Sequence, residues 1–283
     1  MTAACFSSRL AARFAALKAE GRAGFVTFLT AGDPDAATSA AILAGFPKAG
    51  ADLIELGMPF SDPMADGPAI QAANGRALKR GMTIKGVLDL VRGFRTQETT
   101  TPLILMGYYN PIYVHGGAAF VKAAKAAGVD GLIVVDLPPE EDAELREPAE
   151  ASGLDLIRLV APTTDAVRLP RVLQDASGFL YYVAVTGITG SQSALPATVR
   201  RGVKALKAKT DLPVAVGFGI SEPEQVEALG SMAEGVVVGS ALIRRLVANL
   251  DPHGRPTPSL VPDVLDLVTT LSAPLRQGYS QSR

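Results

Sequence analysis

The chain has 283 residues, of which 48% are apolar and 19% are charged, proportions typical of a globular protein rather than a disordered one. Its 27 Lys and Arg residues nearly balance its 28 Asp and Glu residues, which argues against a nucleic-acid-binding protein because such proteins usually carry a basic excess. The single cysteine, Cys5, excludes an intramolecular disulfide and cysteine-rich metal sites.

The first 20 residues carry four charged residues among alanines, whereas a signal peptide keeps its apolar block free of charge. We expect an amphipathic helix over about 6–19. Two long stretches lack charge, Thr101–Val121 and Ala176–Val199, but Gly, Pro and polar residues interrupt both. Neither is expected to span a membrane, and the prediction is a cytoplasmic protein.

Eight short apolar runs, bounded by turn residues, predict strands. Their interiors are nearly all apolar rather than alternating, as in parallel strands that are buried on both faces. In chain order the runs are Phe25–Thr30, Leu53–Leu56, Leu103–Met106, Gly131–Val135, Leu156–Val160, Phe179–Val183, Val214–Gly217 and Gly235–Val238.

The segments between these runs are rich in Ala, Leu, Lys and Glu and predict helices. Alternating strands and helices of this number indicate a (β/α)8 TIM barrel, formed by a single domain with a core over about 25–271. A polar tail over 272–283 is expected to be frayed. A doubly wound open sheet is the alternative, but no Gly-x-Gly-x-x-Gly follows the first run. The predicted helices are Ala36–Ala49, Gln71–Lys79, Ile84–Phe94, Phe120–Ala127, Ala143–Ala151, Ala166–Gln174, Pro196–Lys207, Pro223–Leu229 and Ala241–Ala248.

Candidate catalytic residues follow from the position of polar side chains near strand ends, because barrels of this kind place their active sites at the C-terminal ends of the strands. Glu55 lies inside the second apolar run, where a carboxylate must be paired, protonated or functional. The structural alternative is a salt bridge. Asp62 and Asp66 follow in a loop with three prolines, stiff enough to hold a carboxylate in place, with turn capping as the alternative.

Glycines after the seventh and eighth runs predict a phosphate site. Gly217 and Gly219 follow one run, and Gly239 and Ser240 follow the next and open a helix. Glycine lets the backbone approach an anion closely, and a helix N-terminus adds partial positive charge. Ordinary turn chemistry is the alternative reading.

Other polar segments near the predicted strand ends are less specific. The uncharged segment Thr186–Ser191 is typical of a lid that closes over a substrate, or of a mobile surface loop. Tyr108 and Tyr109 suit a flat apolar ligand but also suit core packing. His115 and His253 lack a nearby base or nucleophile and are expected on the surface. No metal site is predicted, because the two histidines are too far apart for a local zinc pair.

One long segment closely resembles the signature of the tryptophan synthase alpha chain family. It is Ala51–Gln71, ADLIELGMPFSDPMADGPAIQ, and it contains both Glu55 and Asp66. The resemblance extends over roughly Phe6 to Leu271. It implies a lyase of tryptophan biosynthesis with a (β/α)8 barrel, which cleaves indole-3-glycerol phosphate by a retro-aldol reaction to indole and D-glyceraldehyde 3-phosphate. Further matching segments, in the same order as in the family, are Phe28–Pro34, Leu105–Ile112, Val135–Glu140, Thr186–Gly190 and Gly217–Ser221.

The resemblance also implies roles for individual residues. Glu55 would be the general acid and base at the reacting carbons, and Asp66 would bind the indole N–H and stabilise the positive charge on the ring. Neither a metal nor a bound cofactor is implied for this chain. The indole and glycerol pocket would be lined by Phe28, Ile70, Tyr108, Ile133, Val135, Leu159, Tyr181 and, in the lid, Thr189. The phosphate would be held by Gly190, Phe218, Gly219, Gly239 and Ser240.

The resemblance further implies a partner, a pyridoxal-phosphate-dependent beta chain in an αββα heterotetramer, to which indole passes through a tunnel. The segments Met58–Asp62 and Tyr109–Asn110 would form the docking face, and docking would order the lid. The isolated chain is therefore expected to be a monomer and a poor enzyme. Ala184 stands where a serine is common in the family, so no lid-anchoring hydrogen bond is expected there.

Two alternatives to this function remain at the level of sequence. One is another phosphate-binding barrel enzyme, an isomerase or epimerase of phosphosugars, which would not need the pair Glu55 and Asp66. The other is a non-catalytic relative that regulates a partner. The presence of both carboxylates and of the glycines that would bind phosphate argues against the latter.

Overall fold

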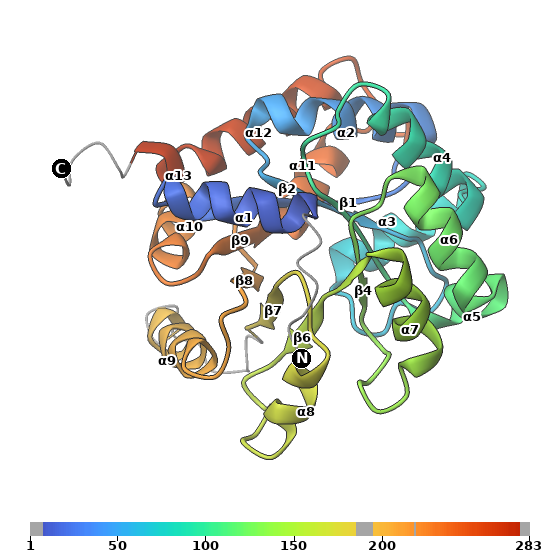
Figure 1. The fold of residues 1–283 in the computed structure, drawn as a ribbon. Coiled ribbons are helices and arrows are strands. Elements are labelled where there is room, and N and C mark those ends of the chain that lie inside the picture. Colours follow the sequence, from blue (N-terminus) through green and yellow to red (C-terminus); the bar gives the residue numbers. More distant parts are fainter. Residues whose placement is uncertain (1–7, 185–194, 218, 278–283) are drawn as a thin grey trace.

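Parallel strands form a barrel in the computed structural model, which describes residues 8–184, 195–217 and 219–277 (Figure 1). The nine strand segments pair in the order β5-β4-β3-β2-β1-β9-β8-β7-β6, always in parallel. Since β5 and β6 follow one another in the chain, this order closes on itself, and the predicted TIM barrel is confirmed. The strands are β1 (Gly24–Thr30), β2 (Leu53–Gly57), β3 (Leu103–Gly107), β4 (Gly131–Val134), β5 (Asp155–Leu156), β6 (Arg158–Val160), β7 (Leu180–Val183), β8 (Val214–Gly217) and β9 (Gly235–Val238).

The fifth predicted strand is divided into two segments. β5 pairs with β4 through Gly131–Asp155 and Leu132–Leu156, and the Ile157 N–H donates to the Leu132 carbonyl at 2.9 Å. β6 pairs only with β7 among the described strands. The barrel therefore has a seam between the C-terminal half of β4 and β6, which the continuous apolar run in the sequence did not predict.

Helices alternate with the strands and cover the barrel (Figure 1). All nine helices expected between strands are present, and Ala36–Ala49 has the predicted bounds. No helix in the described part of the chain is long and apolar enough to cross a membrane. The helices are α1 (Arg9–Ala19), α2 (Ala36–Ala49), α3 (Pro68–Lys79), α4 (Ile84–Arg95), α5 (Tyr109–His115), α6 (Gly117–Ala127), α7 (Ala143–Ser152), α8 (Arg168–Gln174), α9 (Leu195–Lys207), α10 (Pro223–Gly230), α11 (Ser240–Ala248), α12 (Leu260–Ser272) and α13 (Pro274–Gln277).

The expectation of a frayed tail after Leu271 is wrong for residues 272–277. Ser272 ends α12 and is buried, and Leu275 in α13 is 7% exposed. The Arg276 guanidinium donates to the carbonyl of Gly50 at 3.0 Å. These contacts join the C-terminal helices to the end of α2. Such long-range contacts cannot be predicted from the composition of a short polar segment.

Two separate groups of apolar side chains hold the fold together. The larger group lies between the sheet and the surrounding helices. The smaller fills the barrel, where α1 supplies Leu10, Phe14 and Leu17, and Phe14 contacts Phe179 at 5.6 Å between ring centroids. A Cβ at Gly24, the first residue of β1, would lie 2.7 Å from Leu17. Because α1 covers the N-terminal ends of the strands, the C-terminal end is the one left for a site.

Buried ion pairs attach α1 and its following loop to the barrel. Asp52, just before β2, accepts hydrogen bonds from Arg22 at 2.8 and 3.0 Å, from the Phe25 N–H at 2.8 Å and from Arg13. Burial by itself would raise the pKa of Asp52, but the bonds from Arg22, the Phe25 N–H and Arg13 outweigh it and hold the pKa below its ordinary value.

We expect Asp52→Asn to lower the free energy of unfolding at pH 7 by about 2 kcal/mol, because it leaves buried guanidinium groups without their anion. A depressed folded-state pKa stabilises the fold above the unfolded value and loses that effect as the pH falls. Urea unfolding at pH 7 and below pH 4 should therefore show the two proteins converging in acid. An equal difference at both pH values would contradict this role.

Candidate active site

Glu55 lies in the middle of β2 and points into the barrel. Strand residues alternate between faces, and its neighbour two residues earlier, Leu53, packs in the barrel interior, whereas Ile54 and Leu56 pack in the outer core. The Glu55 side chain is 0% exposed, and neither carboxylate oxygen has a hydrogen-bond partner among the described residues. No ion pair between described residues includes it, so the salt-bridge alternative is not supported.

The protonation state of Glu55 follows from this environment. Burial without a compensating charge disfavours the ionised form, and it raises the pKa of Glu55 from 4.5 to about 8. At neutral pH the group is therefore mostly a neutral carboxylic acid. It can donate a proton to a substrate and take one back, which is the property that a general acid and base requires.

Asp66 lies in the loop between β2 and α3, at the turn that precedes Pro68, the first residue of α3. Burial raises the pKa of Asp66, and the hydroxyl of Tyr108 and the amide of Asn74 act in the opposite direction. The Asn74 amide donates to Asp66 Oδ2 at 3.4 Å. Asp62, in contrast, is exposed and bonded to the neighbouring Ser61 hydroxyl. The two aspartates of this loop therefore have different environments: Asp66 is partly buried beside the site, and Asp62 faces solvent.

A cavity of about 250 Å³ lies at the C-terminal end of the barrel and brings Glu55 together with several residues named from the sequence. A smaller adjoining space is lined by Asp66, Tyr108 and Val135. Phe28 and Ile70 line both spaces and thereby join the two carboxylates. The residues named from the sequence that line the larger cavity are Glu55, Phe28, Ile70, Tyr181, Ala184, Gly217, Gly219, Gly239 and Ser240.

The charges of both carboxylates affect the pKa of one phenol, that of Tyr181. Burial raises the pKa of the Tyr181 phenol well above its ordinary value, and the charges of Glu55 and then Asp66 raise it further. Tyr181 lines the same cavity as Glu55. It stays neutral and can donate a hydrogen bond.

Glycines make room for the aromatic walls of the cavity. A Cβ at Gly57 would lie 2.7 Å from the ring of Phe28, and a Cβ at Gly217 would clash with the hydroxyl of Tyr181. Gly219 differs from these, because a Cβ there would meet nothing within 4 Å and its φ is +21°. The open space beside it adjoins Gly239 and the N-terminus of α11, which has no side-chain cap, an arrangement that suits an anion.

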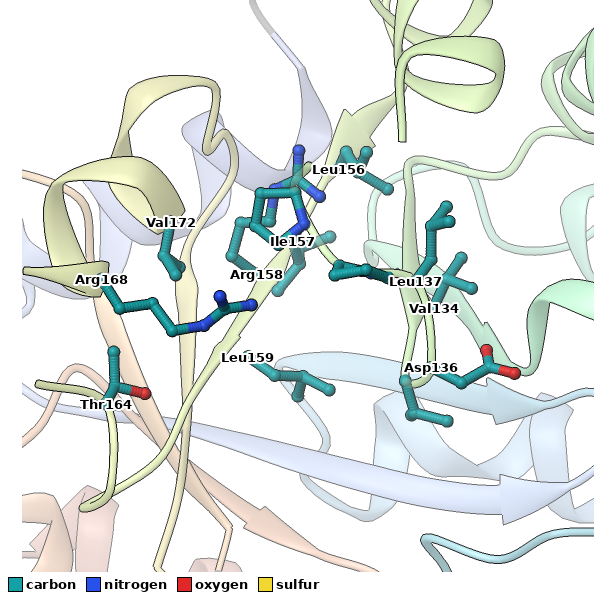
Figure 2. A pocket seen from close by; sticks show the side chains of 13 residues that line it. Val134, Asp136, Leu137, Leu156, Ile157, Arg158, Leu159, Thr164, Arg168 and Val172 are labelled. Carbon is teal, nitrogen blue, oxygen red and sulfur yellow. The ribbon is translucent and has the colours of Figure 1, made fainter. Parts of the chain in front are cut away.

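Of the residues expected in the substrate pocket, Leu159 lines a different cavity instead, and Val135 lines both that cavity and the space beside Asp66. Val135 and Leu159 line a space of about 350 Å³ in the seam between β4 and β6. Figure 2 shows it between Val134 and Asp136 on one side and Arg168 and Val172 on the other. Ile133 is fully buried in the barrel interior. Thr189, Gly190 and Phe218, and with them the expected lid, lie outside the described residues.

One buried polar residue of the site, Asn74 in α3, was not predicted from the sequence; it is 4% exposed. A signal was available, because asparagine is unfavourable inside a helix and Asn74 follows Ile70 by one helical turn. His115 and His253 are exposed, as expected. Within the described ranges, no group of three His, Cys, Asp or Glu residues could hold a metal ion.

Comparison with known proteins assigns the family. The family model of the tryptophan synthase alpha chain matches residues 14–259. The chain belongs to this family. Its fold matches the tryptophan synthase alpha chain of Legionella pneumophila subsp. pneumophila with a TM-score of 0.87 and 37% identity, covering 96% of this chain and 99% of that one. The match to tryptophan synthase of Mycobacterium tuberculosis has a TM-score of 0.84 and 34% identity, covering 95% and 98%.

Membership of the tryptophan synthase alpha chain family assigns this chain to the lyases that cleave indole-3-glycerol phosphate. The buried acid of β2 lines a cavity of this lyase-family chain. For the fold alone, an unpaired carboxyl at this position is unfavourable. Active sites commonly retain groups of this kind at the expense of stability.

We expect Glu55→Gln to stabilise the fold. A carboxyl whose folded-state pKa is raised to about 8 costs stability increasingly as the pH rises from about 4.5 to about 8. The amide has the same shape and no charge, so its advantage should reach about 1 kcal/mol or more at pH 8 and vanish near pH 4. Urea unfolding across this range measures it, and a less stable variant at pH 8 would contradict the burial of an unpaired acid.

Proposed function

We propose that Glu55 and Asp66 carry out the retro-aldol cleavage of indole-3-glycerol phosphate in this chain. The observation that carries the proposal is a fully buried Glu55, without a partner among the described residues, in a cavity whose wall also contains Gly219, Gly239 and Ser240. An acid that serves the reacting carbon and a cradle that serves the phosphate thus share one cavity. The phosphate at this end would accept hydrogen bonds from backbone N–H groups, including the start of α11.

The proposed reaction needs only proton transfers and charge stabilisation. The neutral Glu55 carboxyl protonates C3 of the indole ring, which leaves the ring with a positive charge shared by its nitrogen. Asp66 accepts the hydrogen bond of the ring N–H and stabilises that charge. The bond between C3 and the side chain then breaks, its electrons restore the aromatic ring, and the side-chain hydroxyl becomes the aldehyde as its proton passes to Glu55.

The other residues predicted for the site have supporting roles in this proposal. Phe28, Ile70, Tyr108 and Tyr181 would enclose the ring, and Val135, Leu159 and Ile133 would close the pocket on the side of β4 and β6. Thr189 in the lid would approach Asp66 on closure, and Gly190 and Phe218 would add to the phosphate site. The chemistry requires no cofactor in this chain, and pyridoxal phosphate belongs to the beta chain.

A beta chain is the proposed partner, in an αββα heterotetramer in the cytoplasm. The docking face would comprise the exposed part of Met58–Asp62 and the start of α5 at Tyr109–Asn110. Large apolar side chains beside these segments support this, since Met64, Tyr113 and Val114 are 82%, 59% and 77% exposed. Clustered exposed apolar side chains are typical of an interaction surface. Met58 itself is buried and would contribute indirectly.

The alternative functions are disfavoured by the family assignment and by the site. A phosphosugar isomerase or epimerase would not need Glu55 and Asp66 on adjoining spaces. A non-catalytic regulator would not need an acid that destabilises its own fold. An indole-release assay with indole-3-glycerol phosphate, with and without a beta chain, distinguishes them: release in the presence of the partner supports the lyase, and its complete absence refutes it.

We expect Glu55→Gln to abolish indole release while the variant still binds substrate, because the amide cannot donate and recover the proton. Asp66→Asn should lower kcat by at least about 100-fold, since a positioned charge at a developing cation is worth several kcal/mol. Steady-state kinetics with the beta chain and equilibrium binding of a substrate analogue measure both. Near-normal turnover of either variant would contradict its assigned role.

We expect Gly219→Val to raise KM strongly, because the added side chain would occupy the open space next to the phosphate cradle. Gly254→Val is the matched control. Gly254 also has positive φ, +71°, and no atom near its Cβ position, but it lies in the loop between α11 and α12 and does not line the cavity. The same KM in both variants would contradict the placement of the phosphate.

A further inference from the structure

Asn74 is a buried polar residue on α3 that bonds to its own helix and to two residues of the loop that precedes the helix. Its amide group donates to the Ile70 carbonyl at 3.0 Å and to Asp66 Oδ2 at 3.4 Å. Its amide oxygen accepts from the backbone N–H of Phe60 at 3.1 Å. One side chain thus contacts the two parts of the loop that the proposed function assigns to partner docking and to catalysis.

We propose that Asn74 is a positioning residue that fixes the Asp66 carboxylate relative to the docking segment at Phe60, so that a partner bound there acts on Asp66 through Asn74. This inference rests on the proposed function, because it assigns Asp66 to the substrate and Met58–Asp62 to the partner. It concerns the orientation of Asp66, and no contact between Asn74 and the substrate is involved.

The helix that carries Asn74 is firmly attached to the barrel. Two residues further along α3, Arg76 forms two hydrogen bonds with the carboxylate of Asp33, at 2.7 and 2.8 Å, and Asp33 is 0% exposed. Ala73 and Ala77 on the same helix are fully buried. A bidentate buried pair resists both sliding and rotation. Asn74 therefore has a fixed base from which to orient a loop.

Asp66 depends on neutral donors for its orientation. The groups that face it are the Asn74 amide from α3, the Tyr108 hydroxyl from the end of β3 and, farther away, Tyr181 from β7. Tyr108 has its pKa raised to about 12 and stays neutral, and its oxygen also accepts from the Ala65 N–H at 2.9 Å. No ion pair between described residues includes Asp66. Loss of the Asn74 donor would therefore remove one of the few groups that orient the Asp66 carboxylate.

Phe60 has a second contact with the same network. Its ring lies 5.1 Å from the ring of Tyr108, between centroids. A shift of Phe60 would therefore act on Asp66 both through its backbone N–H and Asn74 and through Tyr108. Only the first route passes through Asn74, so substitutions at Asn74 separate the two.

Two substitutions distinguish the bond that Asn74 makes to Asp66 from the bond that it makes to Phe60. Asn74→Asp keeps an acceptor for the Phe60 N–H but replaces the donor to Asp66 with a second carboxylate. Asn74→Ala removes both bonds. Lys79→Ala, an exposed position on the same helix, is the matched control and should behave as the parent protein does. Thermal unfolding of each variant verifies that it is folded.

The first readout does not require activity. In the isolated chain labelled with 13C at aspartate carboxyls, with the Asp66 signal assigned through Asp66→Asn, Asn74→Asp should raise the measured pKa of Asp66, because the donor is lost and a like charge is added. A smaller rise is expected for Asn74→Ala. An unchanged titration of Asp66 in both folded variants overturns the inference, whatever the outcome of the indole-release assay.

The second readout uses the complex with the beta chain. Asn74→Asp should lower kcat about tenfold with KM within about twofold, as expected for one lost bond to a charged group, and should move the acidic limb of the pH–rate profile to higher pH. Asn74→Ala should additionally reduce the stimulation by the partner. If both variants lose kcat equally and the acidic limb of the pH–rate profile does not move, Asn74 has a merely structural role and the inference is overturned. Absence of activity in the parent complex refutes the proposed function instead.

Discussion

The burial of one carboxyl, that of Glu55, with no partner in the part of the chain that the structure describes, is the constraint on which the rest of the site depends. In water this group would be ionised at neutral pH, and inside a barrel lined by apolar side chains it is not. The same burial that costs folding free energy supplies an acid of suitable strength for protonating a carbon atom. The fold therefore has to tolerate an unfavourable residue in the middle of a central strand, and it does so by surrounding β2 with two strongly apolar neighbours, β1 and β3.

The two ends of the barrel differ in structure: the N-terminal end is closed, and the C-terminal end contains the cavity. The N-terminal end is closed by α1 and by ion pairs around Asp52 and Asp130, where Arg95 donates to Asp130 at 2.6 Å. The C-terminal end keeps its polar groups for the cavity, and there aromatic rings lie against glycines so that the walls can approach closely. In this fold the N-terminal face usually contributes stability, and the active site is usually built from strand ends and loops at the C-terminal face.

Much of this arrangement was predictable from the sequence, for identifiable reasons. Nearly continuous apolar runs predicted the parallel strands, because burial on both faces removes alternation, and Glu55 was conspicuous as the only carboxylate inside such a run. The short helix α5 escaped prediction because Tyr109–His115 contains a proline and few strong helix formers. The seam at Ile157 escaped because pairing between strands is a property of two segments, and an apolar run describes only one of them.

The direct test of the central claim is the titration of Glu55 itself, followed through the 13C signal of its carboxyl in labelled chain and assigned with Glu55→Gln. We expect a midpoint near 8, far above that of an ordinary glutamate. A midpoint near 4.5 would mean that the carboxyl is solvated or paired, and would contradict the role of Glu55 as the buried proton donor.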